Sequence, residues 1–295
     1  MDQLYEKLAI GGKDVYIVEA HHFVLMPWAH IRRGLETAPT LITLDHHTDT
    51  VDAFRGHRYR ATKGDSDRSN AMLPELIASI DWKDDKSLLK AVSMLRHDEH
   101  IHTAFLAGII SCAFAINLSD QLPSVEEDAF SEATSRRFNQ LLARMAPEPM
   151  PDRPTPPFNY ARRDDGMFTI SADCAIGCDN VPHDDECVVV RAGQVLESLY
   201  LDHELATANR MATCMGLASV EAEPYILDID LDYFHSEKAI TPADASTFHR
   251  LVRNAIAVTV ALEPECVEEL RCDDSKVTAP WLLERLKEHI DAAMK

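Results

Sequence analysis

The sequence predicts an α/β fold: a three-layer, doubly wound and mostly parallel sheet with helices on both faces. Two observations support this prediction. Short apolar segments alternate along the chain with segments of helical periodicity. Acidic and histidine side chains also follow directly after apolar segments, at residues 19–22, 45–49 and 228–232. In such sheets ligands bind at the carboxyl ends of the strands, so we expect a metal site at that edge.

The predicted strands are short apolar or β-branched stretches, as is typical of buried parallel strands. In chain order they cover residues 13–19, 40–44, 168–172, 187–191, 225–234 up to its aspartates, and 255–264. The last stretch also suits the end of a helix, but its β-branched residues favour a strand.

The predicted helices lie between these strands. They follow residue 19, cover much of 69–118, 124–145 and 193–216, run from Thr241 to about residue 253, and follow Pro280. Thr241 is a suitable N-cap and Pro242 a suitable first-turn residue. The charge-free run 103–118 is shorter than the roughly 20 residues of a membrane span, and we expect it to form a buried core helix.

The chain of 295 residues is long enough for a sizeable core. We expect a single catalytic domain over 1–295, with the proline-rich segment 146–157 as a loop between two halves. The net charge of −20 disfavours nucleic acid and anionic membranes as partners. The first 20 residues lack a secretory signal pattern and the seven cysteines are odd in number, so we expect a cytoplasmic protein with free thiols.

Three segments combine an apolar strand with side chains that bind metals. They end in His21 and His22, in the run from Asp45 to Asp49, and in the run from Asp228 to Asp232. Carboxylates and imidazoles together suit manganese, iron or zinc. Six or more such ligands are enough for two metals about 3.5–4 Å apart that share bridging carboxylates and a water.

These motifs, in this order, resemble those of arginases and related ureohydrolases. The family has a histidine after an early strand, then Asp-x-His-x-Asp and then Asp-x-Asp, which match His21, Asp45-His46-His47-Thr48-Asp49 and Asp228-Ile229-Asp230. The residues around these motifs are more similar to those of an atypical branch that includes peptide arginases. Those enzymes convert arginine residues of ribosomal peptides to ornithine and release urea. The resemblance covers three short motifs between residues 18 and 234.

The resemblance implies an arginase-like fold with two Mn²⁺ ions, other divalent metals being possible. The ligand set that it implies is His21, Asp45, His47, Asp49, Asp228 and Asp230. Asp45 and Asp228 are expected to bridge the two metals, His21 and Asp49 to complete one of them, and the remaining pair the other. His22 stays open as the alternative to His21.

Two neighbouring residues are expected to play supporting parts. Asp232 and His46 are interpreted as groups that orient the ligands, or as structure at the strand ends, because metal ligands usually have such outer partners.

The chain departs from ordinary arginases in two places. Val18-Glu19-Ala20 stands where they have Gly-Gly-Asp, and the loop that grips free arginine is not recognisable after Asp49. A peptide substrate has no free amino and carboxylate group at the arginine, so this absence fits a peptide-modifying enzyme. It fits a different small substrate equally well.

Catalysis also needs residues for the guanidinium and for the proton. A carboxylate matches the planar guanidinium. The resemblance implies Glu263 for this contact, because arginases place a glutamate after the strand that follows Asp-x-Asp, and Glu265 is the fallback. In the cluster HDEHIH, His100 is expected to relay a proton to the departing amine at the mouth of the site. Glu99 would orient it and Asp98 would contact the substrate.

The leading hypothesis is a two-metal hydrolase that acts on an arginine-containing peptide. Alternatives are a hydrolase of a free guanidino compound, a deacetylase-like enzyme of the same superfold with one zinc, and an acidic binding module with a vestigial metal site. A separate set could bind zinc, although ordinary thiols are favoured because no Cys-x-x-Cys occurs in it. This set is Cys174, Cys178, His183 and Cys187. The peptide and the oligomeric state are not predicted.

Overall fold

The computed structural model describes residues 4–118, 166–171 and 185–295. These residues form a seven-stranded sheet in the order β1-β2-β7-β6-β3-β4-β5, in which β1 is antiparallel to β2 and the other neighbours are parallel. The strands are β1 (Tyr5–Ile10), β2 (Lys13–Val18), β3 (Thr40–Asp45), β4 (Cys112–Asn117), β5 (Met167–Ser171), β6 (Tyr225–Asp230) and β7 (Ala257–Ala261). The predicted α/β class with a mostly parallel sheet is confirmed.

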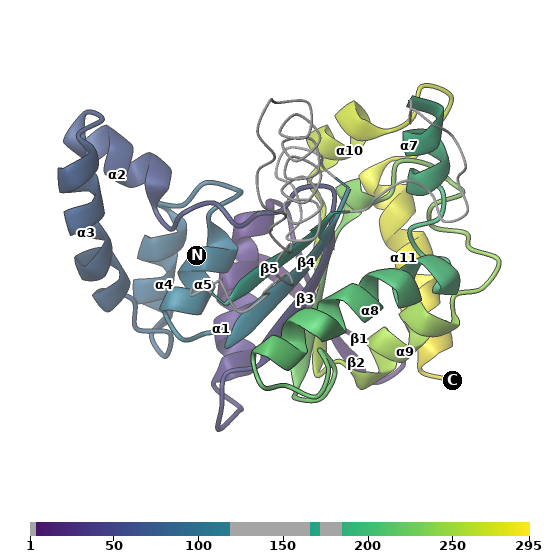
Figure 1. The fold of residues 1–295 in the computed structure, drawn as a ribbon, viewed down its shortest axis with the longest axis horizontal. Helices are drawn as coiled ribbons and strands as arrows, with labels where there is room; N and C mark the ends of the chain where they lie inside the picture. Colours follow the sequence, from purple (N-terminus) through teal and green to yellow (C-terminus); the bar gives the residue numbers. More distant parts are fainter. Residues whose placement is uncertain (1–3, 119–165, 172–184) are drawn as a thin grey trace, which may run out of the picture.

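Helices lie on both faces of the sheet (Figure 1). One side carries α1 (Leu25–Arg32), α4 (Asp85–Val92) and α5 (His100–Leu106), and the other carries α8 (Ser198–Cys214), α9 (Ser246–Asn254) and α11 (Ala279–Ala293). The remaining helices are η1 (His21–Val24), α2 (Arg55–Thr62), α3 (Ser66–Ala78), α7 (Asp185–Ala192), η3 (Leu231–Tyr233) and α10 (Pro264–Leu270). None of the helices in the described ranges is long and apolar enough to cross a membrane.

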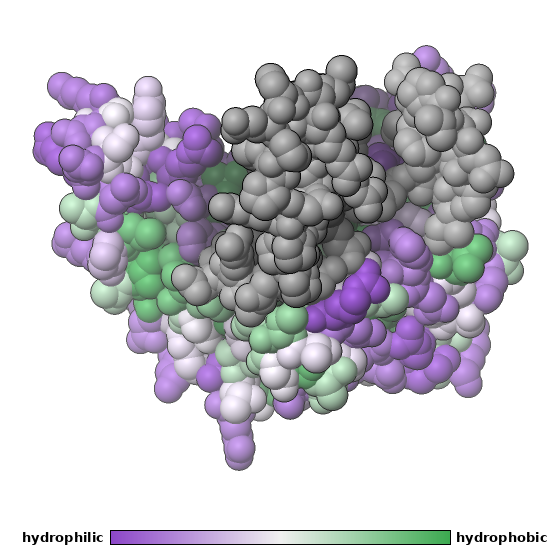
Figure 2. Space-filling view, in the orientation of Figure 1, coloured by the Kyte–Doolittle hydropathy of each residue, from purple (hydrophilic) through white to green (hydrophobic). Residues whose placement is uncertain are grey.

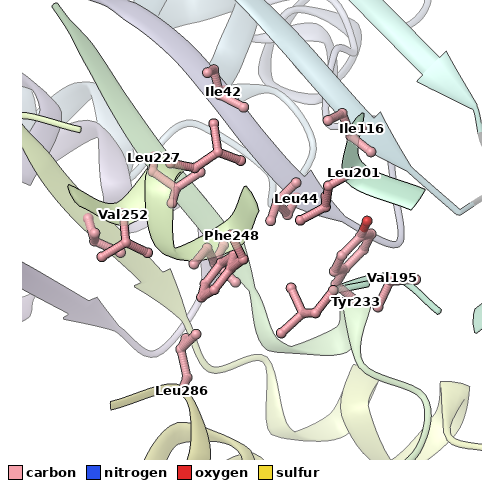
Figure 3. Packing of buried hydrophobic residues seen from close by; sticks show 14 of the residues in the cluster. Ile42, Leu44, Ile116, Val195, Leu201, Leu227, Tyr233, Phe248, Val252 and Leu286 are labelled. Atoms are coloured by element: carbon pink, nitrogen blue, oxygen red, sulfur yellow. The ribbon is translucent and has the colours of Figure 1, made fainter. Parts of the chain in front are cut away.

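The alternation of side chains along β3 separates two hydrophobic cores. Ile42 and Leu44 belong to the core shared with α8, α9 and α11, part of which Figure 3 shows. Leu41 belongs to the core under α1, α4 and α5. Because strand side chains alternate between faces, Thr43 and Asp45 share the face of Leu41. The polar end of β3 therefore points toward the side of the sheet that η1, α1 and α5 cover.

Five predicted strands are confirmed. The stretches 13–19, 40–44, 168–172, 225–234 and 255–264 correspond to β2, β3, β5, β6 and β7. The helices predicted over 193–216 and after Pro280 correspond to α8 and α11, and the one after residue 19 to η1 and α1. The edge strand β1 and the short helix α10 were not predicted.

The run 103–118 does not form the expected buried helix. Helix α5 ends at Leu106, Gly108 has a φ of +68°, and the chain continues as β4, whose six residues are all buried. A left-handed glycine ends a helix readily because it has no Cβ. An uninterrupted apolar run also suits a strand buried on both faces, and periodicity alone does not separate the two.

Two further expectations are wrong. Residues 187–191 lie in helix α7, since β-branched composition is a weak preference that context overrides. The pair at 241 and 242 does not begin α9, which starts at Ser246. The Glu197 carboxylate accepts hydrogen bonds from the backbone N–H groups of Ala243 (2.7 Å) and Asp244 (3.1 Å), which holds this segment as a loop.

Several expectations lie outside the described residues. These are the helix over 124–145, the proline-rich loop 146–157, and the side chains of the Cys174, Cys178, His183 and Cys187 set. Residues before 119 and after 165 contribute strands to the same sheet.

The core assignment predicts a contrast between two leucines. Leu227 is fully buried in the central strand β6, so Leu227→Ala should lower the free energy of unfolding by about 2–5 kcal/mol. Leu199 is 68% exposed on α8, and Leu199→Ala should change it by no more than about 0.5 kcal/mol. Chemical denaturation measures both values. Equal losses for the two variants would contradict the assignment.

Candidate metal centre

A row of polar side chains crosses three strands at one level of the sheet. The register aligns Thr43 of β3 with Asp228 of β6, and Asp228 with Thr259 of β7. The Thr43 hydroxyl donates to Asp228 Oδ2 (2.9 Å) and the Thr259 hydroxyl donates to Asp228 Oδ1. The indole N–H of Trp28 donates to Thr259 Oγ1 (3.0 Å). These contacts hold a fully buried carboxylate in place beneath the end of the sheet.

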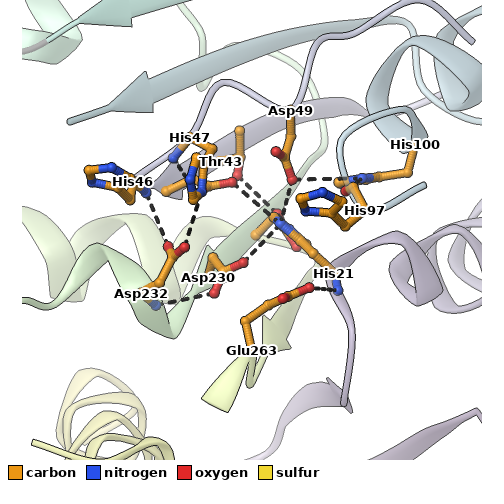
Figure 4. A network of polar contacts seen from close by, with 12 residues as sticks. His21, Thr43, His46, His47, Asp49, His97, His100, Asp230, Asp232 and Glu263 are labelled. Atoms are coloured by element: carbon orange, nitrogen blue, oxygen red, sulfur yellow. Dashed lines mark hydrogen bonds and ion pairs between the residues drawn. The ribbon is translucent and has the colours of Figure 1, made fainter. Parts of the chain in front are cut away.

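His21 lies above this row, at the start of η1. Its Nε2 is 2.8 Å from Asp228 Oδ2. Its other ring nitrogen, Nδ1, faces three further carboxylates. That atom is 2.9 Å from Asp49 Oδ2, 3.1 Å from Asp230 Oδ2 and 3.3 Å from Asp45 Oδ2 (Figure 4). Three carboxylates and one imidazole nitrogen therefore converge.

A second group adjoins the first and shares Asp45 with it. His47 Nδ1 is 3.1 Å from Asp232 Oδ2 and 3.9 Å from Asp45 Oδ1. Two tight backbone contacts shape this group: the N–H of His47 donates to Asp45 Oδ1 (2.7 Å), and the N–H of Asp232 donates to Asp230 Oδ1 (3.1 Å). At the ends of β3 and β6 the chain thus turns, so that a backbone N–H contacts the carboxylate of the aspartate two residues earlier.

The donor atoms of these groups fit a metal ion. His21 Nδ1, Asp45 Oδ2 and Asp232 Oδ2 are buried and have no hydrogen-bond partner among the residues that the structure describes. Of these atoms, His21 Nδ1 and Asp45 Oδ2 lie 3.3 Å apart. The groups whose ligand atoms lie within 4.8 Å of one another are His21/Asp45/Asp230, Asp45/His47/Asp232 and His21/Asp49/His100. No cysteine belongs to these groups, and carboxylates together with imidazole suit divalent ions such as manganese, iron or zinc.

Electrostatics make this centre unfavourable without a cation. Burial and the neighbouring carboxylates of Asp49 and Asp232 raise the pKa of Asp45 well above its usual range. Burial and Asp232 raise the pKa of Asp230 to about 8. Burial opposes the charged form of His21, but Asp228 and Asp230 outweigh it and raise its pKa. A divalent cation would relieve this repulsion between buried carboxylates.

Asp228, a bridging ligand by resemblance, and Asp232, expected beside the ligands, have different surroundings. Both oxygens of Asp228 accept threonine hydroxyls and it belongs to none of the three groups, whereas Asp232 belongs to one of them. The reason is the strand geometry. Asp228 and Asp230 share a face but lie two residues apart, about 6.6 Å along the strand, so Asp228 lies one level deeper. After the strand ends, η3 turns Asp232 back toward His47.

The remaining histidines of the motifs lie beside the centre. His22 is half-buried, its ring packs 4.4 Å from that of Phe23, and it belongs to none of the donor groups formed by the described residues. His46 donates its backbone N–H to Asp232 Oδ1 (3.2 Å) and its Nδ1 lies 3.1 Å from His235 Nε2. His235 belongs to none of the sequence motifs described above.

Glu263 reaches the edge of the centre from the end of β7. Its carboxylate accepts the backbone N–H of His21 (2.6 Å) through Oε1, and the Cys266 thiol lies 3.5 Å from Oε2. Its φ of +36° is in the left-handed region, as is that of Asp49 (+49°). Left-handed non-glycine residues cost energy and concentrate at functional sites. The fallback residue Glu265 is exposed on α10.

The cluster after α4 does not form the mouth of a site. His100 is fully buried: its ring packs 4.4 Å from that of His21, and its Nδ1 contacts the carbonyl oxygen of His97 (2.8 Å). Glu99 does not orient it, because its two carboxylate oxygens accept the backbone N–H groups of Gly56 (2.6 Å) and Arg96 (3.2 Å). Asp98 is half-buried, and one of its side-chain oxygens has no hydrogen-bond partner among the described residues.

The buried histidine and aspartate side chains could hold a metal ion at the carboxyl ends of β3 and β6. Glu263 supplies a further carboxylate at their edge. Comparison of the chain with protein-family models, with curated proteins and with solved structures gave no match.

The different surroundings of Asp45 and Asp228 predict different metal affinities. Asp45→Asn should abolish Mn²⁺ binding, because Asp45 belongs to two donor groups. Asp228→Asn should weaken binding by roughly 10–100-fold without abolishing it, because Asp228 acts through the orientation of His21. Calorimetric titration with Mn²⁺ measures both. Equal loss in the two variants would place Asp228 among the ligands.

Repulsion between the buried carboxylates predicts how stability depends on pH. The pKa of Asp230 is raised in the folded state, so its contribution to stability is full at low pH and is lost as pH rises toward about 8. Mn²⁺ competes with these protons, and the rise in Tm that it causes should grow between about pH 6.5 and about pH 8.5. Asp230→Asn should raise the metal-free Tm by a few degrees and reduce the rise caused by Mn²⁺. Thermal denaturation with and without Mn²⁺ tests this, and a full rise in the variant would contradict it.

Proposed function

We propose that this chain is a two-metal hydrolase that converts arginine residues of a peptide to ornithine and releases urea. The observation that carries the proposal is the pair of adjoining donor groups that share Asp45, with the carboxylate of Glu263 at their edge. The order of the motifs, which resembles that of arginases, supports it, and the proposal includes an arginase-like three-layer fold for the chain.

In this proposal each metal takes one imidazole and several carboxylates. One site uses His21, Asp45, Asp49 and Asp230, because each of these aspartates has an oxygen within 3.3 Å of His21 Nδ1. The other uses His47 and Asp232 together with Asp45 as the bridge. Two Mn²⁺ ions suit this donor set, although other divalent metals remain compatible with it. When bound, such a pair supplies hydroxide at neutral pH and Lewis-acid polarisation.

The acidic environment supports a cationic substrate. A guanidinium is a planar cation that pairs with a carboxylate in two-point geometry, and Glu263 is the half-buried carboxylate beside the donor groups. Its left-handed backbone fits a residue held in place for a function. Asp98, with a buried oxygen that lacks a partner among the described residues, is assigned a secondary substrate contact.

The reaction that we assign joins the oxygen of water to the guanidinium carbon and breaks the bond from that carbon to Nε. The departing nitrogen takes up a proton and leaves as a primary amine, and the carbon leaves as urea. His100 is the proposed proton carrier. Burial lowers its pKa, so the ring favours its neutral form and gives up a proton readily once it has gained one. Its Nε2 has no hydrogen-bond partner in the described part of the chain. Glu99 instead anchors the loop before α5.

The direct test is product analysis with Mn²⁺-loaded protein. An arginine-containing peptide should release urea and lose the elements CH₂N₂ for each arginine converted, as measured by a urea assay and mass spectrometry. Urea from free arginine alone would overturn the peptide version, and urea from neither substrate would overturn the proposal. One metal for each chain in elemental analysis would favour a deacetylase-like enzyme.

Glu263 and Glu265 provide a matched pair of variants for the substrate contact. Glu263→Gln keeps an acceptor for the N–H of His21 but removes the charge, so kcat/KM for the peptide should fall roughly 10–100-fold. Metal content should not change. Glu265→Gln, at an exposed position on α10, the helix that Glu263 precedes, should leave kcat/KM unchanged. A larger loss in the Glu265 variant would move the substrate contact to that residue.

A further inference from the structure

Helix α2 leaves the metal centre by a short connection. Residues 46–54 join the end of β3, and with it Asp49, to the start of α2. Arg55 follows Asp49 by six positions, which limits their distance to about 20 Å even for a fully extended chain. The start of α2 is therefore within reach of any peptide of moderate length whose arginine occupies the centre.

One side of α2 is fixed to the body of the protein. The backbone N–H of Gly56 donates to the Glu99 carboxylate (2.6 Å), and a Cβ at this position would lie 2.5 Å from the Arg96 side chain. The buried Arg58 donates to the carbonyl oxygens of Ala53 (3.1 Å) and Ser69 (3.2 Å). These contacts make the helix a rigid support for whatever its other side carries.

The other side of α2 is exposed and cationic. Arg55, Arg60 and Lys63 are exposed, and their side chains make no hydrogen bond or ion pair with any residue in the described ranges. Tyr59, 65% exposed, lies among them. With α3, this helix projects from the rest of the molecule (Figure 1), and its surface is strongly hydrophilic (Figure 2). We call Arg55, Tyr59, Arg60 and Lys63 the α2 face.

This face contrasts with the charge of the whole chain. The protein carries a net charge of −20, yet residues 55–68 hold five basic residues against two acidic ones. Screening limits the reach of the remaining charge to about 8 Å at physiological salt, so an anion in contact with the α2 face is governed by the local cations. Unpaired arginine and lysine side chains next to a tyrosine offer charge and apolar contact together.

We propose that the α2 face binds an acidic segment of the same peptide whose arginine enters the metal centre. This inference rests on the proposed function. A peptide can carry an arginine and an acidic segment at separate positions, and so match both the acidic centre and the cationic face. A uniform polyanion would match the face alone and be repelled by the rest of the surface. A separation of about six residues between the arginine and the acidic segment is enough for an extended peptide to span about 20 Å.

Binding of designed peptides tests the face separately from catalysis. The first probe carries three glutamates eight residues from a single arginine, the second replaces the glutamates with glutamine, and the third keeps the glutamates but replaces the arginine with glutamine. Fluorescence anisotropy with metal-free protein should show tighter binding of the first and third probes than of the second. Their binding should weaken as salt rises. Equal binding of the glutamate and glutamine probes would overturn the inference.

Charge variants locate the binding. Arg55→Gln/Arg60→Gln/Lys63→Gln should weaken binding of the glutamate probes roughly tenfold, and Arg55→Lys/Arg60→Lys should retain it. The control Lys86→Gln/Lys90→Gln/Lys295→Gln removes the same charge from exposed positions on α4 and at the C-terminal end, and should bind as the unmodified protein does. Circular dichroism checks that the variants fold. Unchanged binding in the α2 variant would overturn the inference.

Two further outcomes separate this inference from the proposed function and from other anions. Urea release with the same KM for glutamate and glutamine peptides would support the proposed function and rule out peptide binding by the α2 face. Binding of the glutamate probes to this face without urea from any arginine peptide would instead rule out the proposed hydrolysis of arginine. Tighter binding of a single-stranded oligonucleotide or of phosphatidylserine vesicles to the face would assign it to another anion and overturn the peptide.

Discussion

Four carboxylates lie around a single buried imidazole, and their mutual repulsion is the constraint on which the rest of the site depends. Asp45, Asp49, Asp228 and Asp230 all have an oxygen within 3.3 Å of a ring nitrogen of His21. Buried like charges this close raise one another's pKa and favour either protonation or a cation. A sequence that places so many acids at one point supports a metal centre better than it supports a stable apolar core.

The carboxylates differ in how many hydrogen-bond partners the sheet supplies to them. Both oxygens of Asp228 accept threonine hydroxyls, Oδ2 also faces His21 Nε2, and Trp28 donates to one of these threonines. Asp228 therefore lies where it can orient the imidazole, as outer carboxylates do beside metal-bound histidines. The acids at the ends of the strands have fewer internal partners, and their oxygens are therefore the ones available to a cation.

Backbone conformation adds to the same arrangement. Asp49 and Glu263 both have positive φ values and lie on opposite sides of His21. Such residues store strain that the surrounding structure must overcome, and here one carboxylate contacts the imidazole of His21 and the other contacts its backbone N–H. The loop after Asp49 then leads to α2, so a single connection supports both the centre and the cationic face that we propose for the peptide.

The sequence by itself determined the α/β class, most of the strands and the neighbourhood of the site, because apolar runs that end in acids and histidines are local patterns. It did not determine which aspartates have free oxygens. The assignments of Asp228 and Asp232 depended on register across three strands and on the turn in η3. The strand at 112–117 was equally ambiguous, since a buried helix and a doubly buried strand look alike in composition. Only tertiary contacts settle such choices, because neighbouring strands and not the local chain supply the hydrogen-bond partners.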